Sequence, residues 1–251
     1  MKEADGNKCL FGTIYSFNAP PVAELIKISG FDWVMIDMEH SALSLGDTQL
    51  ALQVLGDDII KFVRVPGNDD IWIKRILDTG CDGIIVPMVN SADEAERVVW
   101  SSKYPPAGHR SVGAARAHKY GASFNEYVAE ANRRIVLMIQ IEHIEAVKNI
   151  DSILNVKGID SVFIGPYDLS ASIGLTGQVS HPEVRSAVNL IKGKCREKGL
   201  PYGIFGTEPA SLREEIKDGC TYVLCGVDLT ILQNSYRRIL ESLSSQEPVN
   251  F

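Results

Sequence analysis

The chain has 251 residues, of which 45% are hydrophobic and 23% charged, with a formal net charge of -7. This composition suits one sizeable core, and the net negative charge argues against a nucleic-acid surface, which needs clustered Lys and Arg. No stretch is long and apolar enough for a signal peptide or a membrane span. The five cysteines form no CxxC pair, so neither a zinc site nor a disulfide framework is predicted. We expect a single domain over residues 1–251, in a cytoplasmic protein.

Short apolar runs alternate along the chain with longer amphipathic segments. Each run is apolar almost throughout, which is typical of a parallel strand covered on both faces. The predicted strands are 10–15, 33–37, 61–64, 83–86, 135–141, 161–164, 202–205 and 222–225. The predicted helices are 22–29, 47–55, 71–79, 91–102, 124–132, 183–198, 211–218 and 229–243.

Several predicted helices end at a glycine suited to a helix C-terminus, namely Gly30, Gly80, Gly199 and Gly219. Eight strand–helix units in one domain predict a closed (β/α)8 TIM barrel. An open doubly wound sheet is the alternative. Its dinucleotide-binding form is disfavoured because no GxGxxG follows the first strand.

The longest irregular segment is 104–123, which carries Arg110, Arg116 and His118. Long loops without secondary structure in compact domains are usually functional. We therefore expect this segment to be an active-site flap or a subunit contact.

Polar side chains follow four predicted strands, where a barrel places its reactive groups. An anion, a metal ion and a proton could all be held there if the strands form a barrel. The residues are Asp37 at the end of 33–37 with Glu39 and His40 just after it, Arg64 at the end of 61–64, Gln140 and Glu142 around the end of 135–141, and Asp168 after 161–164.

Glu142 and Asp168 are the predicted metal ligands. Two carboxylates with water make a hard oxygen site suited to Mg²⁺ or Mn²⁺. Co²⁺ and Zn²⁺ are the alternative metals. The structural alternatives are a helix N-cap for Asp168 and an ion pair for Glu142.

His40 is the predicted general base, with Asp37 as the partner that orients its imidazole and Glu39 as the weaker candidate. The alternative for His40 is a loop residue without a role. Arg64 ends an apolar strand, where a guanidinium needs an anionic partner. That partner is either a substrate carboxylate or enolate, or Asp37 or Glu39.

The runs FDWVMIDMEH, VRVP, KYPPAGHRSVG, QIE with AVKNID, and FIGPYDLSASIG resemble the HpcH/HpaI family of class II, pyruvate-dependent aldolases. The matching runs keep their order from about Gly12 to Leu232. The resemblance implies a divalent metal (Mg²⁺, Mn²⁺ or Co²⁺) without an organic cofactor. It also implies a homohexamer built as a trimer of dimers, with an exchanged C-terminal helix.

The resemblance further implies a role for each matched residue. Glu142 and Asp168 hold the metal, Arg64 contacts the keto acid, and Asp37 and His40 form a dyad. The remaining substrate-binding positions are Gln140, Gly165, Pro166, Tyr167, Phe205 and Arg116, the last of which belongs to the flap and reaches a neighbouring subunit's site.

The chain departs from the family pattern at three places. Tyr167 stands where small or amide residues are common, Phe205 where aliphatic ones are, and residues 14–17 offer no equivalent of an expected aromatic. All three departures bear on which acceptor aldehyde the protein accepts, whereas the residues expected to carry out the reaction are unchanged.

The resulting hypothesis is reversible cleavage of a 4-hydroxy-2-keto acid to pyruvate and an aldehyde through a metal-stabilised enolate. Aromatic-compound or sugar-acid catabolism is the expected setting. No lysine stands at a strand end suited to a Schiff base. The alternatives are oxaloacetate decarboxylation, a malyl- or citramalyl-CoA lyase, and a barrel that binds a keto acid without turnover.

Overall fold

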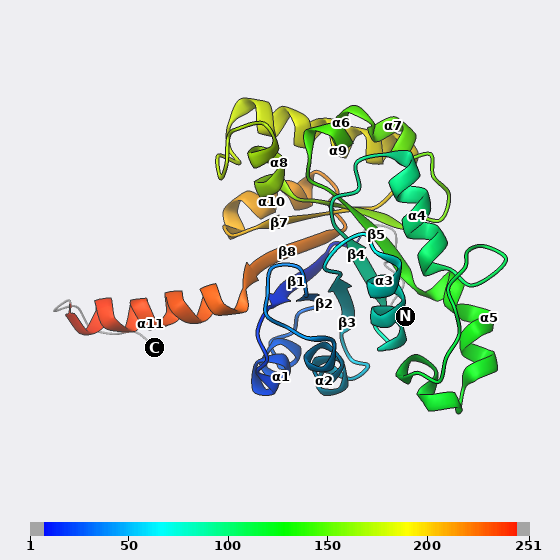
Figure 1. Ribbon diagram of the computed structural model, residues 1–251. Coiled ribbons are helices and arrows are strands. Elements are labelled where there is room, and N and C mark those ends of the chain that lie inside the picture. The colour runs from blue at the N-terminus through cyan, green and yellow to red at the C-terminus, as the bar shows by residue number, and fades with distance from the viewer. Residues whose placement is uncertain (1–7, 245–251) are drawn as a thin grey trace.

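The computed structural model describes residues 8–244, which form a closed barrel of parallel strands (Figure 1). Each strand pairs with its sequence neighbours, and β1 closes the barrel against β8. The strands are β1 (Leu10–Tyr15), β2 (Trp33–Asp37), β3 (Ile60–Arg64), β4 (Gly83–Val86), β5 (Val136–Ile141), β6 (Ser161–Ile164), β7 (Tyr202–Gly206) and β8 (Tyr222–Val227). The predicted TIM barrel is confirmed, and the open sheet is wrong.

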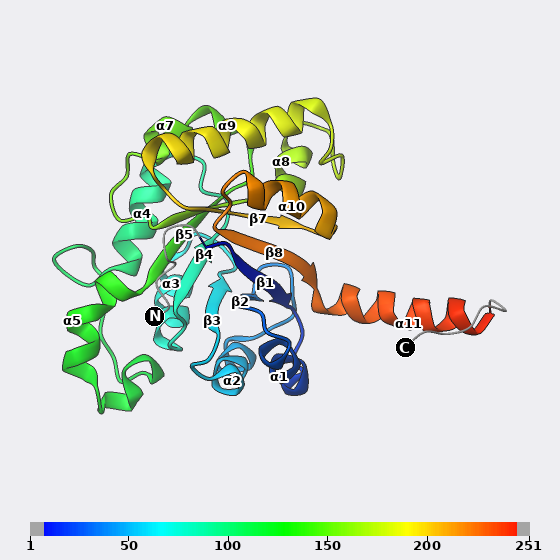
Figure 2. The ribbon, with the colours of Figure 1, turned by 180° about the vertical axis from the view of Figure 1, so that it is seen from behind.

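Helices surround the barrel, as the views from both sides show (Figures 1 and 2). The predicted helices appear as α1 (Pro20–Ile28), α2 (Leu45–Leu55), α3 (Asp70–Asp78), α4 (Ala92–Ser102), α5 (Phe124–Arg134), α9 (Pro182–Lys198), α10 (Pro209–Lys217) and α11 (Asp228–Ser244). Four short elements were not predicted: η1 (Arg116–Gly121), α6 (Ile144–Lys148), α7 (Ile150–Ile153) and α8 (Pro166–Ser172). They are too short for a helical pattern to be visible in the sequence.

Local signals at the helix ends explain their positions. Ser44 and Asp47 form a reciprocal capping box at the start of α2, which satisfies backbone donors there. Gly199 ends α9 in the left-handed region, with φ +64°, where a side chain would be strained.

Two apolar layers hold the barrel together. The outer layer lies between strands and helices, and the inner one fills the barrel around Trp33, which meets Phe62, Phe163 and Tyr222 edge to face. A Cβ at Gly12 would lie 2.3 Å from the Trp33 ring, so only glycine admits that indole. This packed interior leaves the carboxyl ends of the strands as the place for a site.

The segment 104–123 does not cover those strand ends in its own chain. Arg110 is buried, donates to Asp78 at the end of α3 (2.8 Å) and lies over the Tyr104 ring, 4.6 Å from its centroid. Because α3 leads into the amino end of β4, the segment packs toward the opposite end of the barrel. The segment therefore does not cover the site of its own chain, and a flap over a neighbouring subunit's site or a subunit contact stays a prediction.

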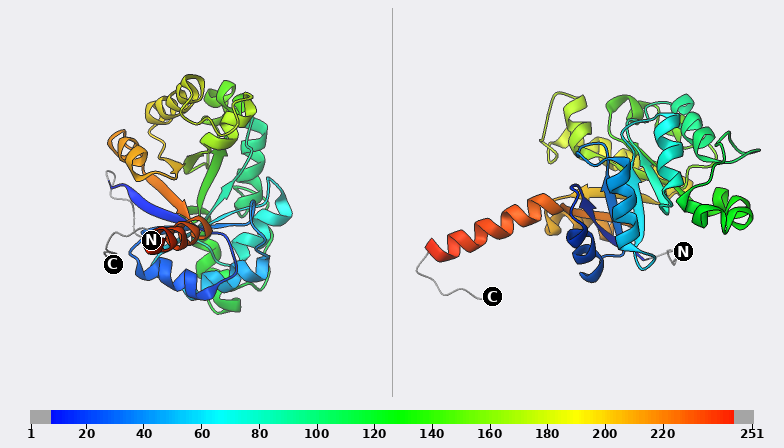
Figure 3. Two further views of the ribbon diagram at one scale, coloured as in Figure 1. Left: turned by 90° about the vertical axis from the view of Figure 1, so that its left-hand side faces the viewer. Right: turned by 60° about the horizontal axis from the view of Figure 1, so that its bottom comes forward.

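Helix α11 leaves the barrel and extends away from it (Figure 3). Its first residue, Asp228, accepts hydrogen bonds from the Ser16 amide (2.7 Å) and hydroxyl (2.5 Å) and is buried. Several large apolar side chains farther along the helix are exposed. In the part of the chain that the structure describes, no helix is both long and apolar enough to span a bilayer.

Candidate active site

Asp37 and Arg64 are the last residues of neighbouring strands and lie side by side in the register of β2 and β3. Arg64 donates from Nε to Asp37 Oδ1 (2.9 Å) and from Nη2 to Oδ2 (2.7 Å), and its Nη1 lies 3.3 Å from Glu39 Oε2. Burial alone would raise the pKa of Asp37, but the hydrogen bonds and charge of Arg64 outweigh it and lower that pKa. The predicted protein partners of Arg64 are thus both present.

The imidazole of His40 lies beside Glu39, with Nε2 at 3.7 Å from Oε2, and the side chain is 61% exposed. Asp37 contacts His40 only through the backbone amide, at 3.3 Å. The expectation that Asp37 orients the imidazole is therefore wrong in this structure, because both Asp37 oxygens are occupied by Arg64. Glu39 is the carboxylate that faces the ring.

Glu142 is 2% exposed and has no ion pair within residues 8–244, so the structural alternative for it is wrong. Its Oε1 accepts a hydrogen bond from the Met88 amide (2.8 Å), and its Oε2 accepts one from the Gln140 amide group. Met88 has φ +55°, an unfavourable conformation for a residue with a side chain. Neighbouring backbone and amide groups thus fix the carboxylate in place.

Asp168 lies in the first turn of α8, but the N-cap of that helix is Gly165, and no side chain caps it. The N-cap alternative for Asp168 is therefore wrong. No hydrogen bond or ion pair to its carboxylate occurs among the described residues, and it faces the same cavity as Arg64 and Gln140. Asp168 is available to a ligand.

Four carboxylates, those of Asp37, Glu39, Glu142 and Asp168, influence one another's charge at this end of the barrel. Burial, together with the charges of Asp37 and Asp168, raises the pKa of Glu39 to about 7 despite the Arg64 charge. Burial, with Glu39 and Asp168 nearby, likewise raises the pKa of Glu142 to about 7, although hydrogen bonds from Gln140 and Met88 oppose this. Such a cluster is stabilised by a cation.

The donor set fits a hard divalent metal. Gln140 Oε1 is buried without a hydrogen-bond partner in residues 8–244, beside the carboxylate of Glu142. A Cβ at Gly165 would lie 2.9 Å from Glu142 Oε2, so glycine keeps the space next to that oxygen open. No three acidic, histidine or cysteine side chains in the described chain are placed to hold one ion. Glu142 and Asp168 would therefore share it with water and substrate oxygens.

A cavity of about 390 Å³ lies over these groups, a size suited to a small metabolite. It brings together most of the predicted site residues, which lie in β2, β3, β5 and β7, just after β2, and at the start of α8. The predicted residues in its lining are Asp37, His40, Arg64, Gln140, Gly165, Pro166, Tyr167, Asp168 and Phe205.

Two predicted residues do not line the cavity themselves: Glu142 lies directly behind Gln140, to which it is hydrogen-bonded, and Arg116 lies far from it. The Arg116 guanidinium donates to the carbonyl of Thr79 (2.7 Å), just after α3 and toward the amino end of the barrel. A contribution of Arg116 to a neighbouring subunit's site stays a prediction.

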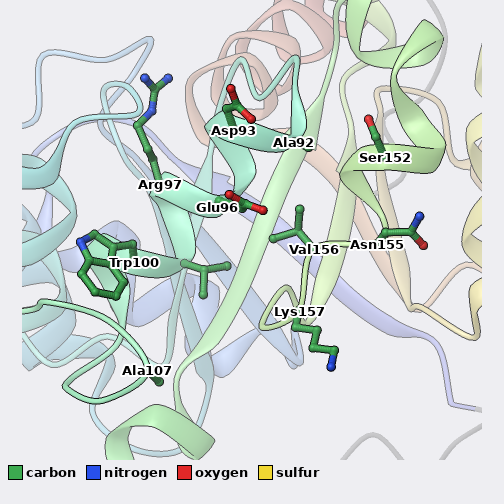
Figure 4. A pocket seen from close by; sticks show the side chains of 11 residues that line it. Ala92, Asp93, Glu96, Arg97, Trp100, Ala107, Ser152, Asn155, Val156 and Lys157 are labelled. Atoms are coloured by element: carbon green, nitrogen blue, oxygen red, sulfur yellow. The ribbon is translucent and has the colours of Figure 1, made fainter.

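A second, wider groove lies on the outer wall between α4 and residues 152–157 (Figure 4). Trp100, Glu96 and Arg97 line it from α4, and Lys157 from the other side. Trp100 stacks on His109, with ring centroids 5.4 Å apart. None of the residues predicted for the site lines this groove.

Sequence reasoning misses one contributor to the site, Met88, and underestimates another, Glu39. Glu39 was ranked below Asp37 as the neighbour of His40, because strand alternation was extended into residues 38–40, where the strand has already ended. Met88 acts through its backbone amide, which no side-chain pattern reveals.

A closed parallel barrel with acids and an arginine around a cavity at the carboxyl ends of its strands has the architecture of a TIM-barrel enzyme, with its site where that fold places active sites. Residues 13–235 match the family model described as HpcH/HpaI aldolase/citrate lyase, and the chain belongs to that family as an aldolase, a carbon–carbon lyase.

Curated relatives and solved structures support the assignment of the chain to this family. The chain is 37% identical over 226 residues to a hydroxypyruvate/pyruvate aldolase of Sagittula stellata, covering 89% of each. It is 35% identical over 225 residues to a 5-keto-4-deoxy-D-glucarate aldolase of Escherichia coli O6:H1, covering 89% of this chain and 88% of that one. The structure of a family member from Burkholderia cenocepacia J2315 has a TM-score of 0.92 and 29% identity, covering 96% and 97% of the two chains.

Proposed function

We propose that this aldolase reversibly cleaves a 4-hydroxy-2-keto acid into pyruvate and an aldehyde, with a divalent metal as its cofactor. The observation that carries the proposal is the grouping of Arg64, Gln140 and Asp168 around one cavity at the carboxyl ends of the strands, with Glu142 hydrogen-bonded to Gln140 directly beside it. Cationic and oxygen-donor groups together suit a 2-keto acid, which presents a carboxylate and a carbonyl.

Arg64 holds the keto acid. A guanidinium has five N–H donors; two of them bind Asp37 and Nη1 lies 3.3 Å from Glu39, so the donors that neither carboxylate uses remain for a substrate oxygen. Because Asp37 fixes the plane of the guanidinium, these donors are already oriented before charge develops on the substrate. Such preorganised donors stabilise an enolate oxygen more than they stabilise the neutral carbonyl.

Glu142 and Asp168 are the metal ligands in this proposal. A bound Mg²⁺, Mn²⁺ or Co²⁺ would act as a Lewis acid that polarises the keto acid and offsets negative charge. Gln140 positions Glu142 through its amide and offers a buried, unpartnered oxygen beside it.

His40 moves the proton of the C4 hydroxyl, directly or through water. Its imidazole is exposed to the cavity and lies 3.7 Å from Glu39, whose carboxylate stabilises the imidazolium that forms. In the condensation direction, the same imidazolium returns the proton to the aldehyde oxygen.

The test is condensation of pyruvate with a panel of aldehydes in the presence of Mn²⁺, with products identified by mass. We expect 4-hydroxy-2-keto acids, and cleavage of an isolated product should release pyruvate. Metal-dependent pyruvate binding without a product from any aldehyde would instead support a barrel that only binds keto acids.

We also propose that α11 packs on a neighbouring subunit in an oligomer, a trimer of dimers. Five of its exposed apolar residues recur at helical spacing, which is typical of a face buried in an interface. They are Leu229, Tyr236, Ile239, Leu240 and Leu243. The double substitution Ile239→Glu, Leu243→Glu should lower the mass measured by light scattering, whereas Ser235→Glu should not. A wild-type monomer would contradict this.

A further inference from the structure

Two aromatic rings form one wall of the cavity, next to the metal ligand Asp168. Tyr167 precedes Asp168 in α8, and Phe205 lies in the neighbouring strand β7. Their ring centroids are 5.9 Å apart, at an interplanar angle of 52°. Tyr167 is 38% exposed and Phe205 is half-buried, so both rings have surface left for a ligand to cover.

The rest of this part of the lining is mostly apolar. Ile14, Leu224, Val227 and Leu229 contribute to the same cavity from β1, β8 and the start of α11. Two uncharged polar residues, Ser16 and Thr230, lie beside them, and Ser16 already binds the Asp228 carboxylate. A substituent that enters here moves from water into contact with apolar side chains. This transfer stabilises binding of apolar groups more than binding of polar ones.

The charges of the lining disfavour a second carboxylate on the substrate. Of the lining residues, all in the part of the chain that the structure describes, Arg64 and His40 are the ones able to carry positive charge. Arg64 is already paired with Asp37 and Glu39, and its remaining donors are assigned to the pyruvate half; His40 lies beside Glu39. A divalent cation would balance Glu142 and Asp168, so no cationic side chain of this lining is left to bind a second carboxylate, on the aldehyde.

We propose that Tyr167 and Phe205 determine the aldehyde specificity of this enzyme and select aldehydes with an apolar substituent over aldehydes that carry a carboxylate. The inference rests on the proposed aldolase function. The two rings hold the substituent of the aldehyde while Arg64 and the metal ligands hold the pyruvate half, and the new bond forms between them.

The test compares two aldehydes of equal length, butanal and succinic semialdehyde, which differ in a terminal methyl or carboxylate. The ratio of their kcat/KM values at saturating pyruvate cancels any general loss of activity. The wild type should prefer butanal by about tenfold or more, the range that apolar contacts of one or two carbons provide. An equal or reversed preference would overturn the inference.

Variants separate ring packing from other effects. Tyr167→Ala and Phe205→Leu should each lower the ratio several-fold, mainly through a higher KM for butanal. Tyr167→Phe keeps the ring and should keep the ratio. Trp100→Ala, in the outer groove of Figure 4, is the control for loss of an exposed aromatic elsewhere and should also keep it. Ratios unchanged in Tyr167→Ala and Phe205→Leu would overturn the inference.

A separate measurement distinguishes failure of the inference from failure of the proposed function. Exchange of the pyruvate methyl protons in D₂O reports enolate formation without any aldehyde. Exchange together with a preference for succinic semialdehyde overturns the specificity inference alone. Absence of both exchange and product, with either aldehyde, overturns the aldolase proposal and this inference with it.

Discussion

Arg64 and Asp37 are joined by two hydrogen bonds, of 2.9 Å and 2.7 Å, at the carboxyl ends of adjacent strands. The pair is almost completely buried, and the guanidinium also lines the cavity. Asp37 therefore fixes the direction in which the remaining Arg64 donors face. The predicted effects of changing either residue follow from this geometry.

Changing Arg64 to Ala should reduce the kcat/KM for aldol cleavage by an amount equivalent to about 3 kcal/mol or more, as for loss of an oxyanion donor. Arg64→Lys keeps the positive charge but loses the planar group that donates two parallel hydrogen bonds to Asp37. It should therefore retain only part of the wild-type activity. Steady-state kinetics with a coupled pyruvate assay measures both. Full activity in the Lys variant would show that charge alone is required.

Asp37→Asn should destabilise the protein in a pH-dependent way. The pKa of Asp37 is lowered below its ordinary value of 3.8, so its stabilising effect is present above 3.8 and is lost as the pH falls through the folded-state pKa. At pH 7, loss of this buried pair should cost about 3 kcal/mol of unfolding free energy. Urea unfolding of both proteins at pH 7 and pH 3 should show the difference shrinking at low pH, and a constant difference would contradict the assignment.

Gly165→Ala should displace the Glu142 carboxylate, because the added Cβ would lie 2.8 Å from Glu142 Cβ and 2.9 Å from Oε2. We expect weaker Mn²⁺ binding by calorimetry, with a matching loss of activity. Gly193→Ala, inside α9 with no heavy atom within 4 Å of the added carbon, is the matched control and should stabilise the helix by about 0.5–1 kcal/mol. Equal metal affinity in the two variants would be inconsistent with the proposed site.

His40→Ala should separate two reactions that share an enolate. Cleavage of a 4-hydroxy-2-keto acid needs a base for the hydroxyl proton, whereas decarboxylation of oxaloacetate does not. We expect aldol cleavage to fall at least about a hundredfold, with decarboxylation largely retained. Glu39→Gln should show a smaller loss in the same direction. Parallel losses of both reactions would argue against a role for His40 in proton transfer.

The barrel was predictable because its signals are local and repeated. Apolar runs marked the strands, and Gly30, Gly80, Gly199 and Gly219, all with positive φ, marked the turns that lead from helices into strands. The strand ends then identified Arg64, Glu142 and Asp168, because a barrel brings those ends together.

The finer contacts were not predictable from sequence. The choice of Arg64 rather than His40 as the partner of Asp37 depends on the register of β2 and β3. The contact between Met88 and Glu142 depends on one backbone conformation. The packing of the loop with Arg110 against Asp78 depends on the path of twenty residues without a periodic pattern, 104–123.

The most direct test of the central claim is proton exchange at the pyruvate methyl group after removal of all metal. EDTA-treated enzyme in D₂O should show no exchange by proton NMR, and Mg²⁺ should restore it in the wild type but not in Glu142→Gln. Exchange that persists after complete chelation, or a covalent pyruvate adduct trapped by borohydride, would contradict a metal-dependent mechanism at Glu142 and Asp168.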